Sequence, residues 1–104
     1  MSSLAFMKTS AEHKIIEVNE TYCKITGYSK EELLGKSPSF ISSGKHPKEF
    51  YQKMWKELNE TGLWRGKIIN KNKSGDLFTI SALIKIIKDD KGDVSYYTEE
   101  STLL

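Results

Sequence analysis

The segment Asn19–Lys36, with the sequence NETYCKITGYSKEELLGK, constrains the fold more than any other part of the chain. Asn19 is a good N-cap, because its side-chain oxygen can accept a hydrogen bond from the first helical turn. Gly27 can adopt the positive φ that ends a helix. Ser29 and Glu32 have the spacing of a capping box, which begins a second helix. The segment therefore predicts two short helices that meet at a glycine corner.

Hydrophobic patterning predicts one longer helix and strands on both sides of the helices. We expect strands at residues 4–9, 14–18, 64–71, 77–88 and 94–100, a helix at 47–61, and an irregular segment with one helical turn at 37–44. The longer helix carries an apolar stripe of Phe50, Tyr51, Met54, Trp55 and Leu58. Hairpins at both ends with helices between them predict an α+β fold, a five-stranded antiparallel sheet with helices packed on one face.

Composition indicates a soluble domain and argues against several partners. The 104 residues suffice for one domain with a single core, and the net charge of +2 with scattered lysines predicts no nucleic-acid partner. The single cysteine, Cys23, excludes an internal disulfide and suits a cytoplasmic protein. Residues 1–7 lack the pattern of a signal peptide, and no apolar run approaches the roughly 18 residues of a membrane helix. We therefore expect no direct membrane contact.

The motifs of common enzymes and metal sites are absent from the sequence. No H-x-x-x-H, C-x-x-C or phosphate-loop spacing occurs. Both histidines, His13 and His46, fall in predicted loops, and Cys23 has no cysteine or histidine close to it in the sequence. We therefore expect a protein that is not an enzyme and has no metal site.

The long strand at 77–88 has two apolar faces. One face carries Phe78, Ile80, Ala82, Ile84 and Ile86. It is expected to face the core or a cavity. The small Ala82 either leaves room for a ligand or lets a helix approach closely. The other face carries Leu83 and Ile87, which require cover. We therefore expect a homodimer through this outer face, assisted by the N-terminal residues.

Three motifs together resemble those of PAS (Per-Arnt-Sim) sensory domains. They are I-x-x-V-N at residues 15–19, I-T-G-Y-S-x-E-E-L-L-G-K at 25–36, and K-x-G at 73–75 before the long strand. The resemblance implies that residues 1–104 are a single domain, a fragment of a larger bacterial signalling protein such as a two-component system. It further implies a cavity that binds a small ligand or cofactor and a relay to an attached histidine kinase, cyclase or chemoreceptor segment. The alternative is a cofactor-free PAS module for dimerisation and relay.

Comparison with two classes of PAS domain argues against a covalent flavin adduct and against haem binding. Light-oxygen-voltage flavin sensors carry a reactive cysteine just after the G-K/R dipeptide that closes the helical corner, and here the corresponding residue is Pro38. No covalent flavin adduct is therefore expected. Haem-binding PAS proteins usually place a ligating histidine on or near the long helix. Here the helix contains none and only His46 lies just before it, so haem is not expected.

A third class, the FAD-binding redox sensors of nitrogen-fixation and methane-oxidation regulators, shares more of the sequence. The shared motifs are G-K-x-x-S-x-x-S-x-G at 35–44, F-Y-Q-x-M-W at 50–55 and W-x-G-x-x-x-N-K at 64–71. This resemblance implies FAD as a candidate cofactor, contacted by Trp55 and Asn70. Pro38 departs from the class, which places a carboxylate there. Core packing alone would also explain Trp55.

The alternation of side chains along the strands, which identifies the inward-facing residues, and the PAS comparison together select six candidate site residues. They are Trp55, Asn70, Ile80, Ala82, Ile84 and Ser101. Ser101 rests on the comparison alone. A buried Asn70 is expected to be paired with a ligand, a water or a backbone group, because an unpaired buried amide costs roughly 1–3 kcal/mol.

Overall fold

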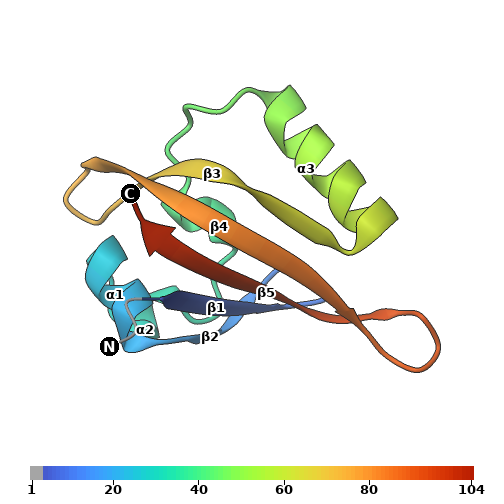
Figure 1. The fold of residues 1–104 in the computed structure, drawn as a ribbon. Coiled ribbons are helices and arrows are strands. Elements are labelled where there is room, and N and C mark those ends of the chain that lie inside the picture. Colours follow the sequence, from blue (N-terminus) through green and yellow to red (C-terminus); the bar gives the residue numbers. More distant parts are fainter. Residues whose placement is uncertain (1–3) are drawn as a thin grey trace.

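An antiparallel sheet of five strands forms the frame of the fold (Figure 1). The computed structural model describes residues 4–104. Residues 1–3 lie outside the described residues. They include the start of the segment that lacks a signal-peptide pattern and part of the N-terminal region expected to assist the dimer. The strands are β1 (Ala5–Ser10), β2 (Ile15–Val18), β3 (Leu63–Lys71), β4 (Leu77–Lys88) and β5 (Val94–Leu103). They lie in the order β2-β1-β5-β4-β3, and every neighbouring pair is antiparallel. The expected α+β fold is confirmed.

The central strand, β5, extends beyond its expected end at Glu100 to Leu103. Ser101 is paired on both sides, opposite Ala5 of β1 and Ala82 of β4, whereas Thr102 and Leu103 are paired with β4 only. The extension is therefore set by two neighbouring strands and not by the local sequence, which has no strong strand signal there.

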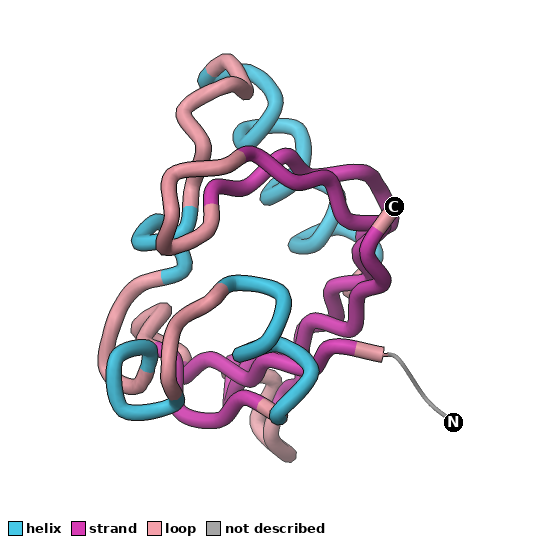
Figure 2. Tube along the Cα trace, turned by 90° about the vertical axis from the view of Figure 1, so that its left-hand side faces the viewer, coloured by secondary structure: helices cyan, strands magenta, loops and turns pink. Residues whose placement is uncertain are grey.

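The helices lie along the chain between β2 and β3. They are α1 (Glu20–Thr26), α2 (Lys30–Leu33), the 3₁₀ turn η1 (Pro38–Ile41) and α3 (Lys48–Thr61). Figure 2 shows the strands as a curved band, with α1 and α2 beside its β1–β2 end. Pro47 was expected inside α3, but it is the N-cap, with an extended backbone (φ −71°, ψ 164°). Across residues 4–104, no helix is long and apolar enough to cross a membrane.

The predicted glycine corner is confirmed in detail. The Asn19 side chain accepts hydrogen bonds from the backbone N–H groups of Tyr22 and Phe6, both at 3.0 Å, and so caps α1 and ties it to β1. Gly27 ends α1 with φ 78°. Ser29 and the residue three positions later form the reciprocal capping box that begins α2. Local sequence signals therefore determine this corner.

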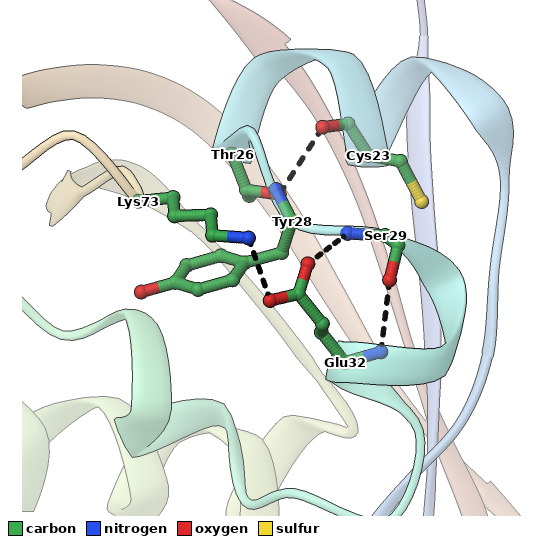
Figure 3. A network of polar contacts seen from close by, with 6 residues as sticks. All are labelled: Cys23, Thr26, Tyr28, Ser29, Glu32 and Lys73. Carbon is green, nitrogen blue, oxygen red and sulfur yellow. Dashed lines mark hydrogen bonds and ion pairs between the residues drawn. The ribbon is translucent and has the colours of Figure 1, made fainter.

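A lysine from the β3–β4 turn fastens the corner to the far end of the sheet. The Lys73 ammonium lies 2.8 Å from the Glu32 carboxylate, which also accepts the Ser29 N–H at 2.9 Å (Figure 3). The backbone N–H of Lys73 donates to the carbonyl oxygen of Thr26 at 2.8 Å. The side-chain contact spans 41 positions in sequence, and together the two contacts hold the β3–β4 turn against the α1–α2 corner.

The buried apolar side chains form two clusters. The first cluster comes from β1, β2 and the short helices and consists of Ala5, Met7, Ile15, Val18, Tyr22, Leu33 and Ile41. The second cluster comes from α3, β3 and β4 and consists of Met54, Leu58, Trp64, Ile68, Ile80 and Ala82. The space between the two clusters is where the candidate site lies.

Candidate functional site

A cavity of about 430 Å³ separates the two apolar clusters. Its wall is formed by α1, the η1 segment, α3, the β1–β2 turn and the inward face of the sheet. The lining residues are Met7, Thr9, His13, Tyr22, Ser37, Pro38, Ser39, Ile41, Ser42, Tyr51, Met54, Trp55, Ile68, Asn70, Ile84, Tyr97, Thr98 and Glu99. This volume lies within the range of about 300–1,000 Å³ that is usual for small-molecule sites.

Three of the six predicted site residues line this cavity. Trp55 comes from α3, Asn70 from the end of β3 and Ile84 from β4. All three line the same cavity, but the β3–β4 register pairs Asn70 with Phe78 and Ile84 with Trp64, so these two lie six positions apart along the ladder, at different parts of the wall. Their role in binding a ligand stays a prediction.

The other three predicted residues do not line the cavity. Ile80 and Ala82 are 2% and 3% exposed and pack in the second cluster. Ser101 is paired opposite Ala82 and is equally buried. Period-two alternation correctly placed Ile80 and Ala82 on the inner face, while Ser101 was selected by the PAS comparison alone. The second cluster, which includes α3, covers this part of the face. The open part lies further along β4, at Ile84.

Asn70 presents an amide that no described residue of the chain satisfies. The residue is 7% exposed and lines the cavity. Its backbone bridges to Ser42, but within residues 4–104 its side-chain amide makes no hydrogen bond. The expected partners were a ligand, a water or a backbone group. Since no described backbone group pairs with this amide, we expect a ligand or a water in the cavity to do so.

The most unusual group on the wall is Glu99, which the sequence analysis did not select. It lies on the central strand β5, where its register partners on the two sides are Met7 and Ile84. The residue is 8% exposed, and its Oε2 atom has no hydrogen-bond partner among the described residues. Burial raises the pKa of this carboxyl from 4.5 to about 7.

Tyr22 adds a second unsatisfied polar group to the wall. It projects from α1, is 3% exposed, and its hydroxyl also lacks a partner in the described part of the chain. Burial and, to a lesser extent, the charge of Glu99 raise the pKa of Tyr22 well above 10. Two buried polar groups that are left unpaired each cost roughly 1–3 kcal/mol, which is typical of a site that a ligand or ordered water completes.

Three aromatic rings in mutual contact line part of the cavity. The His13 ring stacks on Tyr97 at 5.0 Å between centroids and meets the edge of Trp55 at 4.8 Å. The rings of Trp55 and Tyr97 are 5.6 Å apart. Within residues 4–104, His13 is the only non-glycine residue with a positive φ, 65°, a conformation that histidine adopts more readily than most residues. The tight β1–β2 turn thus brings an imidazole over the cavity.

A sequence signal for Glu99 did exist. Once Ser101 is placed on the inner face, strand alternation also places Glu99 and Tyr97 there. The prediction ended this strand at Glu100, so the alternation was not carried backwards from Ser101. No comparable signal places Tyr22 or His13 at the cavity, because their contacts depend on how α1 and the β1–β2 turn fold over the sheet.

His46 lies outside the cavity. Its ring stacks on Phe50 at 3.9 Å, and its Nε2 atom accepts a hydrogen bond of 2.8 Å from the backbone N–H of Ile69. This nitrogen therefore has a structural partner. In the part of the chain that the structure describes, no group of three or more His, Cys, Asp or Glu side chains is placed to hold a metal ion.

Comparison with known proteins identifies the family. The model of the PAS domain family matches residues 3–100, so the chain belongs to the PAS domain family. The PAS domain of a protein from Colwellia psychrerythraea has the same fold, with a TM-score of 0.91 over 99% of this chain and 87% of that chain at 18% identity. The light-state dimer of the fungal blue-light photoreceptor Vivid gives a TM-score of 0.82 over 98% and 78% of the two chains at 20% identity.

Curated relatives are regulators and receptors. The chain is 34% identical to the nitrogen fixation regulatory protein of Klebsiella oxytoca over 92% of its length, and 26% identical to the aerotaxis receptor of Escherichia coli over 80%. It spans 19% and 17% of the lengths of these two relatives. The chain is thus similar to a PAS sensory domain of signalling proteins.

Proposed function

We propose that this PAS domain is a cytoplasmic sensory module of a larger signalling protein, that it binds a small ligand or cofactor in its cavity, and that it relays occupancy to an attached output segment. The main support is the 430 Å³ cavity, in which Tyr22, Asn70 and Glu99 present polar groups without partners in the described chain. The relatives, a nitrogen fixation regulatory protein and an aerotaxis receptor, are consistent with an output such as a histidine kinase or a chemoreceptor segment.

A ligand can act as a signal here because the cavity lies between two structural units. Met7, Tyr22 and Ile41 belong to the first cluster, while Met54 and Ile68 belong to the second, and all five line the cavity. A ligand that contacts both clusters favours one relative position of α3 and the β1–β2 hairpin over others. Such a bias is the physical requirement for a conformational signal.

FAD is the candidate cofactor that the PAS resemblance suggests, and the cavity wall suits its flavin ring in part. Trp55 supplies an aromatic surface and Asn70 an unsatisfied amide for the ring's polar edge. No lysine or arginine is among the described lining residues, so the phosphates would lie outside the cavity. Pro38 at the wall offers no thiol for a covalent adduct.

Filling the cavity tests the proposal. Ile84→Trp adds a large side chain to the wall at a half-buried position, and it is expected to weaken ligand binding by about tenfold or more. FAD is the first probe. Its visible absorbance is measured in the freshly purified protein and in titrations. Native mass spectrometry detects any other ligand that co-purifies. Lys85→Trp is the matched control, because Lys85 is the next residue and lies exposed on the opposite face. A ligand retained equally by both variants would place the site elsewhere.

The proposed partner is a second copy of the chain, bound through the outer sheet face. Leu83 and Ile87 lie on that face and remain partly exposed, and Leu83 is flanked by Arg65 of β3 and Glu100 of β5. An apolar side chain flanked by two charged residues is suited to an isologous contact, in which each copy contributes the same patch. If no ligand binds, this dimer supports the alternative function, a cofactor-free relay module.

Leu83→Glu is expected to weaken this dimer by about tenfold or more, because it places a carboxylate in an apolar contact. Light scattering and sedimentation at high micromolar concentration measure the effect. Leu34→Glu is the control: this leucine is 39% exposed, but it is the C-cap of α2 and belongs to none of the strands of the sheet. A wild-type protein that is monomeric under these conditions would contradict the proposed interface.

A further inference from the structure

We propose that the cavity selects a small organic amine with an apolar or aromatic body, whose ammonium group pairs with the buried carboxylate of Glu99 and the hydroxyl of Tyr22. This inference rests on the proposed ligand-binding function and names the chemical class of the ligand. Both protein groups are more than nine-tenths buried, line the cavity and lack partners in the described chain.

The charges around the cavity favour a cation. The chain contains 16 lysines and arginines, yet none of them is among the described residues that line the cavity. Glu99 is the single acidic residue among the described residues of the wall. A ligand carboxylate or phosphate would meet a buried carboxylate with no compensating cation, whereas an ammonium would neutralise it. An uncompensated buried charge is strongly unfavourable, so the cavity favours positively charged ligands over negatively charged ones.

The hydrogen-bonding groups and rings fit the same ligand. An ammonium has donors only and no acceptor. The ionised Glu99 carboxylate and the Tyr22 hydroxyl can both accept from it, while the Asn70 carbonyl oxygen is a further acceptor on the wall. The rings of Tyr51, Trp55 and Tyr97 provide apolar surface for the ligand's body and electron-rich faces that attract a cation.

Binding of such a ligand is linked to the ionisation of Glu99. The groups that flank Glu99 are its register partners, Met7 from β1 and Ile84 from β4. Tyr22 from α1 is close enough for the charge of Glu99 to raise its pKa, and the other titratable groups that line the cavity are His13, Tyr51 and Tyr97. Because burial raises the Glu99 pKa to about 7, the carboxyl is largely protonated near pH 6 and must lose its proton before it can pair with an ammonium. Affinity should therefore rise with pH through about 7 and fall again only when the amine itself deprotonates, near pH 10 for an alkylamine.

Three probes of matched shape test the selection by charge. Phenethylamine, 3-phenylpropanoate and 2-phenylethanol are titrated calorimetrically into the full chain at about pH 8. Phenethylamine is expected to bind about tenfold or more tightly than either of the others, because only it forms a charge-assisted pair with Glu99. Near pH 6 its affinity is expected to be about tenfold lower than near pH 8.

Variants assign the effect to one residue. Glu99→Gln is expected to remove about tenfold or more of the phenethylamine affinity, together with its pH dependence, and to leave 2-phenylethanol binding nearly unchanged. Glu100→Gln is the matched control, since it removes the same charge one position along β5, on the outer face. His13→Asn tolerates a positive φ and removes the imidazole from the wall, so the pH dependence that Glu99 causes should persist in this variant.

The outcomes separate this inference from the proposed function. Tighter binding of 3-phenylpropanoate, or phenethylamine affinity that is unchanged in Glu99→Gln, would overturn the inference. If FAD or another non-amine ligand binds and Ile84→Trp weakens it, the proposed function stands and the inference is wrong. If none of the probes binds and no ligand co-purifies, both fail.

Discussion

Relative to its Glu99→Gln variant, the wild-type protein is expected to lose about 3 kcal/mol of unfolding free energy as the pH rises from about 4 to well above 7. The Glu99 pKa is about 7 in the folded state and near 4.5 in the unfolded chain. A raised folded-state pKa means that the folded state binds the proton more tightly. Its stabilising contribution is therefore complete below about pH 4.5 and is lost as the pH rises through 7. At about 1.4 kcal/mol per pKa unit, the raised value corresponds to roughly 3 kcal/mol.

Urea unfolding at a series of pH values, followed by tryptophan fluorescence and circular dichroism, measures this difference. Other titrating groups cancel in the comparison; Glu32, whose pKa is lowered by its hydrogen bond to Lys73, is present in both proteins. Glu100→Gln should follow the wild-type profile, because it leaves the inner carboxyl in place. Parallel profiles for wild type and Glu99→Gln would show that Glu99 is solvated, and the carboxyl could then not act as a buried charge in the cavity.

Leu58→Ala is expected to destabilise the fold by about 2–5 kcal/mol. Leu58 is 0% exposed and lies in the second cluster, where it joins α3 to the sheet. Alanine leaves a void that packed neighbours fill only in part. Chemical unfolding with an unchanged m-value would confirm that the loss lies in folded-state packing.

Leu77→Ala provides the control for this measurement. The same atoms are removed at a position that is 49% exposed, so a change within about 0.5 kcal/mol is expected. Equal losses in the two variants would contradict the assignment of Leu58 to a packed core. Both variants retain the residues of the cavity wall, so ligand binding also reports whether α3 still packs on the sheet.

Local signals in the sequence were sufficient for the helical corner and for most of the strand pattern. Asn19, Gly27 and Ser29 act through contacts a few residues away, so their roles can be read without knowing the rest of the fold. The spacing of Met54 and Leu58 likewise identified the buried stripe of α3. Pro47 shows the limit, because a proline suits either the N-cap or the first turn, and its flanking backbone decides between them.

The candidate site was only half determined by the sequence. Alternation along β4 places Ile80, Ala82 and Ile84 on one face, but it does not say which part of that face a helix covers. The docking of α3 decided this, since it packs against Ile80 and Ala82 and leaves Ile84 at the cavity.

The tertiary structure alone decided the chemistry of the cavity. Glu99 became a buried carboxyl because it lies on the inner face of the central strand, between Met7 of β1 and Ile84 of β4, while Tyr22, whose pKa the charge of Glu99 helps to raise, comes from a helix far away in sequence. In the sequence, Glu99 is one of two adjacent glutamates and looks like part of a solvated strand end. The sequence determined the elements through interactions between near neighbours. The raised pKa and the unsatisfied polar groups arose only when distant segments removed those groups from water.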